Sequence, residues 1–307
     1  MAVVLDGHTR MRSRPKVAAL LNASAGTIEA QGEDKLRHAL ASAFEKYGLS
    51  ATLEFLSSAE LGAAARRALR RVKAQELEAI VVGGGDGSIR TLASVLADSG
   101  VPLGIIPLGT LNHFARDLGI PLDFDGAVAL IAAGHAHSVD VGDVNGQIFI
   151  NNSSIGIYPY LVLERERRRR RKRLAKWTAM ILAGLRVLRL LQWRRLAVSA
   201  EGCSEPCRSP CVFIGNNEYT LRVPAFGRRE RLDAGELCLY VAKARSRLAL
   251  FWLACRTILG RLDQLRDLRV LKVSYPIPES LTHWGFPRRR RSDSRWRTGE
   301  CSSCRSR

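Results

Sequence analysis

Two glycine-rich segments of the chain carry residue types that handle phosphate groups. The first, Gly83–Ser88, reads Gly-Gly-Gly-Asp-Gly-Ser and follows two valines. Glycine lets a backbone approach a phosphate closely, and the amides of such a turn can cradle an anion at the start of a helix. Asp86 can hold Mg²⁺ or position an attacking hydroxyl. The segment therefore predicts phosphoryl chemistry, although it lacks the Gly-Lys-Ser/Thr ending of a Walker A loop.

The second segment, residues 107–114, has the sequence PLGTLNHF. Gly109 offers a close backbone approach, Thr110 a hydroxyl and Asn112 an amide. A further turn-forming cluster at 22–26 can meet a nucleotide from one side, with an ordinary turn between strand and helix as the alternative. Asp140 can add a carboxylate to the site, although a solvated turn is favoured for this residue alone.

The segments around these motifs alternate between short apolar runs and helical spacing. We expect strands at 17–21, 51–56, 79–82 and 103–107, and helices at 35–47, 59–73, 88–96 and 111–117. This alternation predicts parallel βαβ units in a Rossmann-like, doubly wound domain over residues 16–138. Ligands bind such sheets where strands end and helices begin, and both glycine segments lie at such junctions.

The pattern changes near Ser138. Short strands are expected at 139–144, 147–151, 196–199, 211–214 and 235–241, and Asn145-Gly146 is a hairpin signal. The chain is therefore expected to be α/β plus β. In this interpretation residues 139–273 form a β-sandwich domain, with a basic helical insertion at 162–192 and a further helix at 247–262.

The net charge of +19 requires an anionic partner or another explanation. Residues 164–176 carry a net +7 and residues 285–307 a net +6. Apolar residues follow the first block, so 164–191 predicts an amphipathic helix that lies on anionic phospholipids. A solvated helix face packed on the core is the alternative. Nucleic acid is disfavoured as a partner, because no recognised motif or aromatic-lined groove accompanies the block.

The absence of targeting signals and the spacing of the cysteines indicate where in the cell the protein is expected. Residues 1–15 form a basic leader without the apolar segment of a signal peptide, and no run of about eighteen apolar residues predicts a membrane span. We expect a cytoplasmic protein, peripheral to the inner face of the membrane, with a homodimer left open. Seven irregularly spaced cysteines favour free thiols. Zinc at Cys203, Cys207 and Cys211 is the alternative, although no nearby histidine completes that set.

Together the motifs resemble the catalytic domain of the diacylglycerol kinase family. The likeness is closest to the soluble bacterial lipid kinases that include sphingosine-kinase-like members. It rests on Asn22–Gly26, on GGGDGS at 83–88 and on PLGTLNHFARDLGIP at 107–121, and it extends over residues 16–273. The resemblance implies an ATP- and Mg²⁺-dependent kinase that transfers the γ-phosphoryl group to a lipid hydroxyl, such as that of diacylglycerol, at a membrane surface.

The resemblance also implies roles for individual residues. Asp86 would be catalytic and organise Mg²⁺, with Asp140 as a supporting catalytic carboxylate and Asp233 as a further metal ligand. ATP would be bound by polar and glycine positions of the loops, namely Asn22, Ser24, Ser57, Gly84, Gly85, Asp86, Gly87, Ser88, Thr110 and Asn112.

The chain departs from the family pattern in three places. His113 stands where many relatives have an aspartate. Asp233-Ala234-Gly235 has one aspartate where many relatives have two, and Cys238 stands near a third acid, so the family's second, structural magnesium site is not expected. After Val273 we find no Asp-Gly-Glu motif, whose acid is the family's proposed general base.

The composition of residues 274–307 is that of a gene read out of frame, and we expect a frameshift near residue 274. Two other functions stay open. One is an NAD-kinase-like kinase of a soluble substrate, and the other is a catalytically impaired product that only binds nucleotide.

Overall fold

The computed structural model describes most of the chain from residue 14 to residue 274. The described residues are 14–156, 194–200, 203–209, 211–220, 227–244, 246, 248–249, 252, 256 and 267–274. Nearly all of the predicted leader and tail, the basic insertion at 162–192 and most of the predicted helix at 247–262 lie outside them. The chain divides into two compact units: residues 1–141 with 147–151, and residues 142–146 with 152–307.

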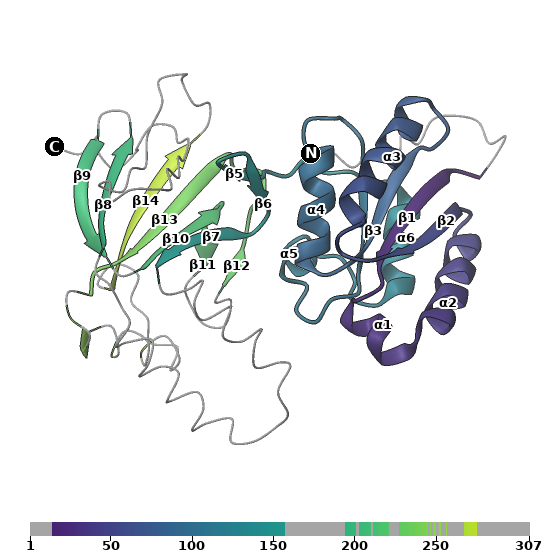
Figure 1. The fold of residues 1–307 in the computed structure, drawn as a ribbon, viewed down its shortest axis with the longest axis horizontal. Coiled ribbons are helices and arrows are strands. Elements are labelled where there is room, and N and C mark those ends of the chain that lie inside the picture. Colours follow the sequence, from purple (N-terminus) through teal and green to yellow (C-terminus); the bar gives the residue numbers. More distant parts are fainter. Residues whose placement is uncertain are drawn as a thin grey trace. The chain divides into compact units, whose positions relative to one another are not determined.

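The first unit is built on a four-stranded parallel sheet in the order β2-β1-β3-β4 (Figure 1). Its strands are β1 (Lys16–Asn22), β2 (Ser50–Leu56), β3 (Ala79–Gly84) and β4 (Leu103–Pro107). Its helices are α1 (Gly26–Gln31), α2 (Glu33–Lys46), α3 (Leu61–Lys73), α4 (Asp86–Leu96), α5 (His113–Asp117) and α6 (Phe124–Ala133). The predicted strands and helices of this half are confirmed, whereas α1 and α6 were not predicted.

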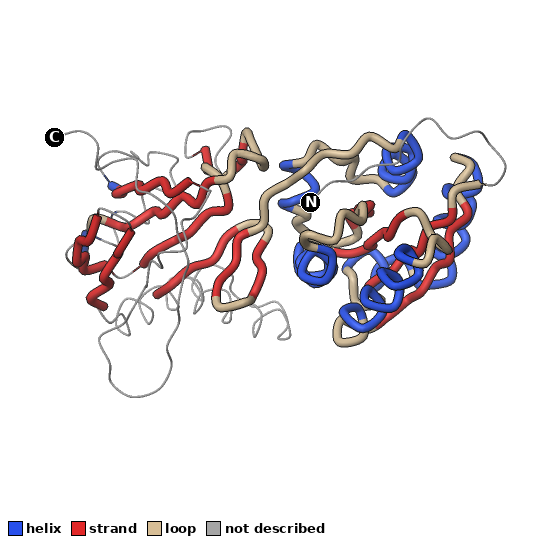
Figure 2. The backbone as a smooth tube through the Cα atoms, turned by 90° about the horizontal axis from the view of Figure 1, so that it is seen from above, coloured by secondary structure: helices blue, strands red, loops and turns tan. Residues whose placement is uncertain are grey.

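Helices cover both faces of this sheet, because the strands are apolar on both sides. Val17, Ala19 and Leu21 of β1 share one core cluster with buried residues of α1, α2 and α6. Ala18 and Leu20 alternate with them, are equally buried, and face the side on which α3 and α4 pack. Figure 2 shows the same arrangement, with helices around the strands of the first unit. The expectation of an α/β unit with a parallel sheet is therefore confirmed.

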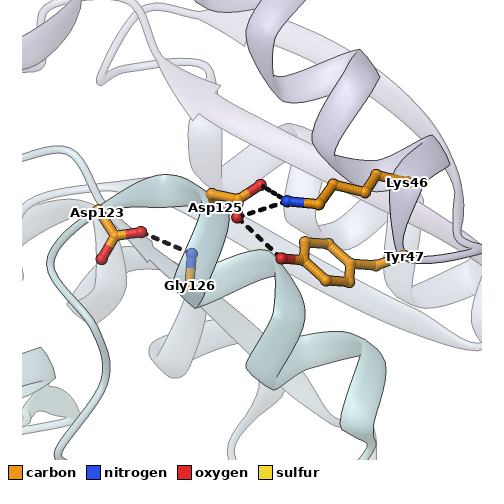
Figure 3. A network of polar contacts seen from close by, with 5 residues as sticks. All are labelled: Lys46, Tyr47, Asp123, Asp125 and Gly126. Atoms are coloured by element: carbon orange, nitrogen blue, oxygen red, sulfur yellow. Dashed lines mark hydrogen bonds and ion pairs between the residues drawn. The ribbon is translucent and has the colours of Figure 1, made fainter.

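A small polar network joins α2 to α6 on the surface of the first unit (Figure 3). The Lys46 ammonium pairs with the Asp125 carboxylate at 2.9 Å, and the Tyr47 hydroxyl donates to the same carboxylate at 2.8 Å. These hydrogen bonds lower the pKa of Asp125 and raise that of Lys46. Asp123 caps α6 by accepting the backbone N–H of Gly126 at 2.7 Å.

The second unit is mainly antiparallel strands in its described part. A four-stranded sheet has the order β14-β13-β10-β7, and two two-stranded ribbons pair β8 with β9 and β11 with β12. The division between the units falls within the hairpin of β5 and β6, so that β6 is counted with the first unit. The long strands are β7 (Asn152–Gly156), β8 (Arg194–Ala200), β9 (Cys203–Ser209), β10 (Cys211–Asn216), β13 (Glu236–Ala242) and β14 (Leu268–Ser274). The short ones are β5 (Gly142–Val144), β6 (Gln147–Phe149), β11 (Tyr219–Thr220) and β12 (Arg228–Arg229).

The hairpin between β5 and β6 forms at the predicted place. Asn145 and Gly146 both have positive φ, 54° and 76°, as a tight two-residue hairpin turn requires. β5 is shorter than expected, because residues 139–141 precede the strand as coil. The β character of this half is confirmed, while its description as a sandwich stays a prediction.

Candidate functional site

The turns after all four parallel strands meet at one edge of the sheet in the first unit. The amide of Ala23, after β1, donates to the carbonyl of Leu56 at the end of β2. The amide of Leu108, after β4, donates to the Gly84 carbonyl of β3, and the amide of Thr27 donates to the Leu108 carbonyl. Main-chain hydrogen bonds therefore tie the four turns into one surface, at the edge where parallel sheets bind ligands.

Asn22 is the side chain that holds three of these turns together. Its Nδ2 donates to the hydroxyl of Ser88 at 2.9 Å. Its Oδ1 accepts the amide of Ser24 at 3.1 Å and the hydroxyl of Ser58 at 3.3 Å. All three of these hydrogen bonds join Asn22 to residues of the turns, so Asn22 fixes the positions of these turns relative to one another.

The two glycine segments touch backbone to backbone at Gly85 and Gly109. A Cβ atom at Gly109 would lie 2.4 Å from the Cα atom of Gly85, closer than any side chain permits. A Cβ atom at Gly84 would lie 2.5 Å from the hydroxyl oxygen of Ser88. At Gly87, in contrast, a Cβ atom would meet nothing within 4 Å. Gly84 and Gly109 are therefore required by packing, whereas Gly87 leaves open space over the first turn of α4.

Asp86 links the two glycine segments through its carboxylate. Oδ1 accepts the backbone N–H of Phe114 at 3.0 Å, and Oδ2 accepts that of His113 at 3.1 Å. These are first-turn amides of α5, which have no acceptor within the helix. Asp86 is half-buried, and each of its oxygens keeps a second lone pair for another partner.

Asn112 lies beneath this junction with an unsatisfied oxygen. It has a left-handed backbone, with φ at 50°, and is buried. Its Nδ2 donates to the carbonyls of Gly109 at 2.8 Å and Pro107 at 3.3 Å. Its buried Oδ1 has no hydrogen-bond partner among the described residues. The amide nitrogen of Asn112 thus supports its own loop, and the expected contact of Asn112 with ATP stays a prediction.

Ser57 is hydrogen-bonded to Glu60 in the turn that precedes α3. Its backbone N–H and its hydroxyl both donate to the carboxylate of Glu60, at 2.9 and 2.6 Å. The same two bonds lower the pKa of Glu60. Glu60 therefore occupies the Ser57 hydroxyl, and this pairing was not predicted from the sequence.

The remaining predicted site residues fall into two groups. Ser24 and Thr110 are exposed at the same edge, where a Cβ atom at Gly26 would lie 3.2 Å from the Thr110 hydroxyl. Asp140 lies half-buried in the coil before β5, in the first unit. Asp233 belongs to the second unit, where it is exposed and paired with Arg231 at 3.1 Å.

The edge suits the phosphates of a nucleotide. It combines a glycine backbone, the N-terminus of α4 and the open space at Gly87. In the described parts of the chain, no group of three His, Cys, Asp or Glu side chains is placed to hold a metal ion. Mg²⁺ that arrives with nucleotide phosphates needs only one or two protein carboxylates, and Asp86 provides one at this edge.

Comparison with known proteins agrees with this chemistry. Residues 16–144 match the family described as the diacylglycerol kinase catalytic domain. A protein of Pseudomonas aeruginosa named "Probable lipid kinase YegS-like" is 43% identical over 94 residues, which are 30% of this chain and 31% of the relative. The "Diacylglycerol kinase" of Bacillus subtilis is 34% identical over 141 residues, 45% of this chain and 46% of the relative.

These matched segments span 31% and 46% of the relatives' length, so the likeness concerns only part of each relative. A solved structure described as a diacylglycerol kinase from Bacillus anthracis is similar in fold. It has a TM-score of 0.58 and 20% identity, and the likeness covers 95% of this chain and 96% of that one. A second structure from this organism has a TM-score of 0.62 at 22% identity, covering 91% and 88%.

The kinase-domain match confirms the resemblance inferred from the two glycine segments. The names of the two matched relatives are those of lipid kinases. No helix in the described residues is long and apolar enough to cross a membrane. The predicted basic membrane helix at 164–191 lies outside the described residues.

Proposed function

We propose that the chain is an ATP-dependent lipid kinase, which transfers the γ-phosphoryl group of ATP to a lipid hydroxyl such as that of diacylglycerol. The observation that carries this proposal is the junction of the two glycine segments, Gly85 against Gly109, with Asp86 bound to the first amides of α5. The names of the matched relatives support the lipid as acceptor.

In this proposal the chain's own groups position the phosphates and neutralise their charge. The amides at the start of α4 receive a phosphate, and Gly87 allows it to approach because no side chain intervenes. Bound Mg²⁺ would neutralise charge on the transferred group, with Asp86 as its protein carboxylate. Asn22 and Asn112 hold the loops in place, which is the positioning that phosphoryl transfer needs.

Phosphate transfer from labelled ATP tests the proposal directly. The acceptor panel contains diacylglycerol, sphingosine, phosphatidylglycerol and NAD, each presented to the full chain with Mg²⁺. We expect label in a lipid, and loss of that label in Asp86→Ala. Transfer to NAD alone would favour a kinase of soluble substrates. ATP binding without any transfer would favour the catalytically impaired product.

A further inference from the structure

The outward side of α3 carries an uninterrupted row of cations. The helix contains no acidic residue, and Arg66, Arg70 and Lys73 follow one another at intervals of four and three. At 3.6 residues per turn these three lie within about 60° of arc. The buried positions of the helix lie on the other side, where Leu61, Ala64, Ala65 and Ala68 pack into the core. We name Arg66, Arg70 and Lys73 the α3 stripe.

The α3 stripe is exposed and lacks acidic partners. The two other cations of the helix are neutralised, since Arg67 pairs with Glu54 at 3.6 Å and Arg71 with Glu76 at 3.1 Å. Among the residues that the structure describes, no carboxylate pairs with any member of the stripe, and all three are exposed. Because Arg67 and Arg71 are paired with carboxylates, the uncompensated positive charge of α3 lies on the outward face that carries the stripe.

The neighbouring helix extends this positive surface. α4 packs against α3, and a Cβ atom at Gly62 of α3 would lie 3.7 Å from the side chain of Thr91 of α4. Arg90 is exposed on α4, next to Thr91 in sequence. Figure 1 shows the two helices side by side. The layer therefore presents cations from both helices, on the side of the sheet opposite α2.

We propose that the α3 stripe docks the kinase unit on an anionic phospholipid surface. This proposal rests on the proposed function, because a lipid hydroxyl must be reached at a bilayer. A row of Arg and Lys on a rigid helix meets several headgroups at once, and each cation near such a surface adds attraction that salt weakens. α3 contains no aromatic residue, so it lacks the stacking groups with which proteins hold single-stranded nucleic acid.

A matched pair of double variants tests this surface in the full chain. Arg66→Gln/Arg70→Gln removes two charges from the stripe, and glutamine preserves helix propensity. Lys16→Gln/Lys35→Gln removes the same charge from exposed positions at the start of β1 and on α2. Binding to phosphatidylglycerol/phosphatidylcholine vesicles is measured by co-sedimentation, at a salt concentration where half of the wild type is bound.

The stripe variant should bind vesicles about thirtyfold more weakly than the wild type, and the control variant less than about threefold more weakly. Equal losses in the two doubles, or unchanged binding of the stripe variant, would overturn the proposal. So would a stripe variant that keeps its vesicle affinity and loses affinity for a DNA duplex, because that result assigns the surface to nucleic acid.

A second readout separates this proposal from the proposed function. Phosphate transfer to diacylglycerol in neutral detergent micelles does not need an anionic surface, so the stripe variant should match the wild type there. If every variant, the wild type included, fails to transfer phosphate, the proposed function is wrong. The ratio of vesicle affinities between the two doubles still decides whether the stripe binds anionic lipid.

Discussion

Asp86 Oδ1 accepts the backbone N–H of Phe114 at 3.0 Å, across 28 positions of sequence. Asp86 Oδ2 accepts the backbone N–H of His113 in the same way. Asp86 is the first residue of α4, and its carboxylate also caps the start of α5. Any change at Asp86 therefore alters the geometry of two loops as well as the local charge.

Replacing Asp86 separates these structural and chemical roles. Asp86→Asn keeps one oxygen acceptor for an α5 amide but loses the charge, whereas Asp86→Ala loses both acceptors. We expect the asparagine variant to be destabilised by about 1–2 kcal/mol and the alanine variant by more. Urea unfolding measures both. Phosphate transfer should be lost in each, and an asparagine variant with wild-type transfer would contradict the chemical role.

Two glycine substitutions separate packing from ligand contact. Gly109→Ala drives a Cβ atom against the Gly85 backbone, so we expect a loss of about 1–3 kcal/mol in stability. Gly87→Ala meets open space within α4 and should leave thermal stability equal or slightly higher. It should nevertheless weaken ATP binding at least tenfold by calorimetry, because the new methyl group occupies the phosphate approach. Unchanged ATP affinity in Gly87→Ala would show that the phosphates of ATP do not bind beside Gly87.

Asn112→Asp tests the support beneath the junction. The amide donates to the carbonyls of Gly109 and Pro107, and an aspartate would turn a carboxylate oxygen toward those same carbonyls. We expect a destabilisation above about 2 kcal/mol, measured by urea unfolding. Asn112→Gly is the control, because it tolerates the left-handed backbone and removes the unpaired oxygen. An aspartate variant as stable as the glycine variant would be inconsistent with this arrangement.

The Asp125 network gives a pH dependence with a defined sign. Bonds from Lys46 and Tyr47 lower the folded-state pKa of Asp125, so the network stabilises the fold above the carboxyl's ordinary pKa. That stability is lost as the pH falls through the lowered pKa. Asp125→Asn should therefore lower the thermal midpoint at pH 7, and the difference from the wild type should shrink below about pH 4. A difference that stays constant down to pH 2 would exclude the linkage.

Cys238 should be unreactive in the folded chain. It is fully buried in β13, and burial raises the pKa of its thiol to about 12. We expect no alkylation of Cys238 by iodoacetamide at pH 8.5 in buffer and complete alkylation in urea, followed by peptide mass spectrometry. Labelling of the native protein at this position would show that β13 opens.

The helices and strands of the first unit were largely predictable from the sequence. Helices cover both faces of its sheet, so each strand is a short apolar run. α6 was missed although Asp123 and Gly134 are the cap residues that mark its two ends. α1 has only six residues and no side-chain cap, so it gave little signal. β14 was missed although its apolar residues suit a strand.

The hydrogen bonds at this edge of the sheet could not be predicted from the sequence. The residue types of Gly83–Ser88 and 107–114 predicted that phosphate groups bind at this edge of the sheet. The sequence alone could not tell that Asn22 pairs with Ser88, because this bond depends on the tertiary approach of two separate loops. The bond from Asn112 to Gly109 lies within one loop, and it depends on the left-handed backbone of Asn112. What holds for Asn22 also holds for Asp86, whose bonds to the amides of His113 and Phe114 join two separate loops, while its role as a metal ligand stays a prediction.

The strand order β2-β1-β3-β4 also constrains when the site can exist during synthesis. β3 must pair with β1 and then receive β4, and the Asp86 cap requires the amide of Phe114. A ribosome-bound chain that ends before Phe114 therefore has the whole first glycine segment but lacks the amide that Asp86 Oδ1 accepts. Since domains fold as units, competence to bind nucleotide should arise in one step, after this residue has left the exit tunnel.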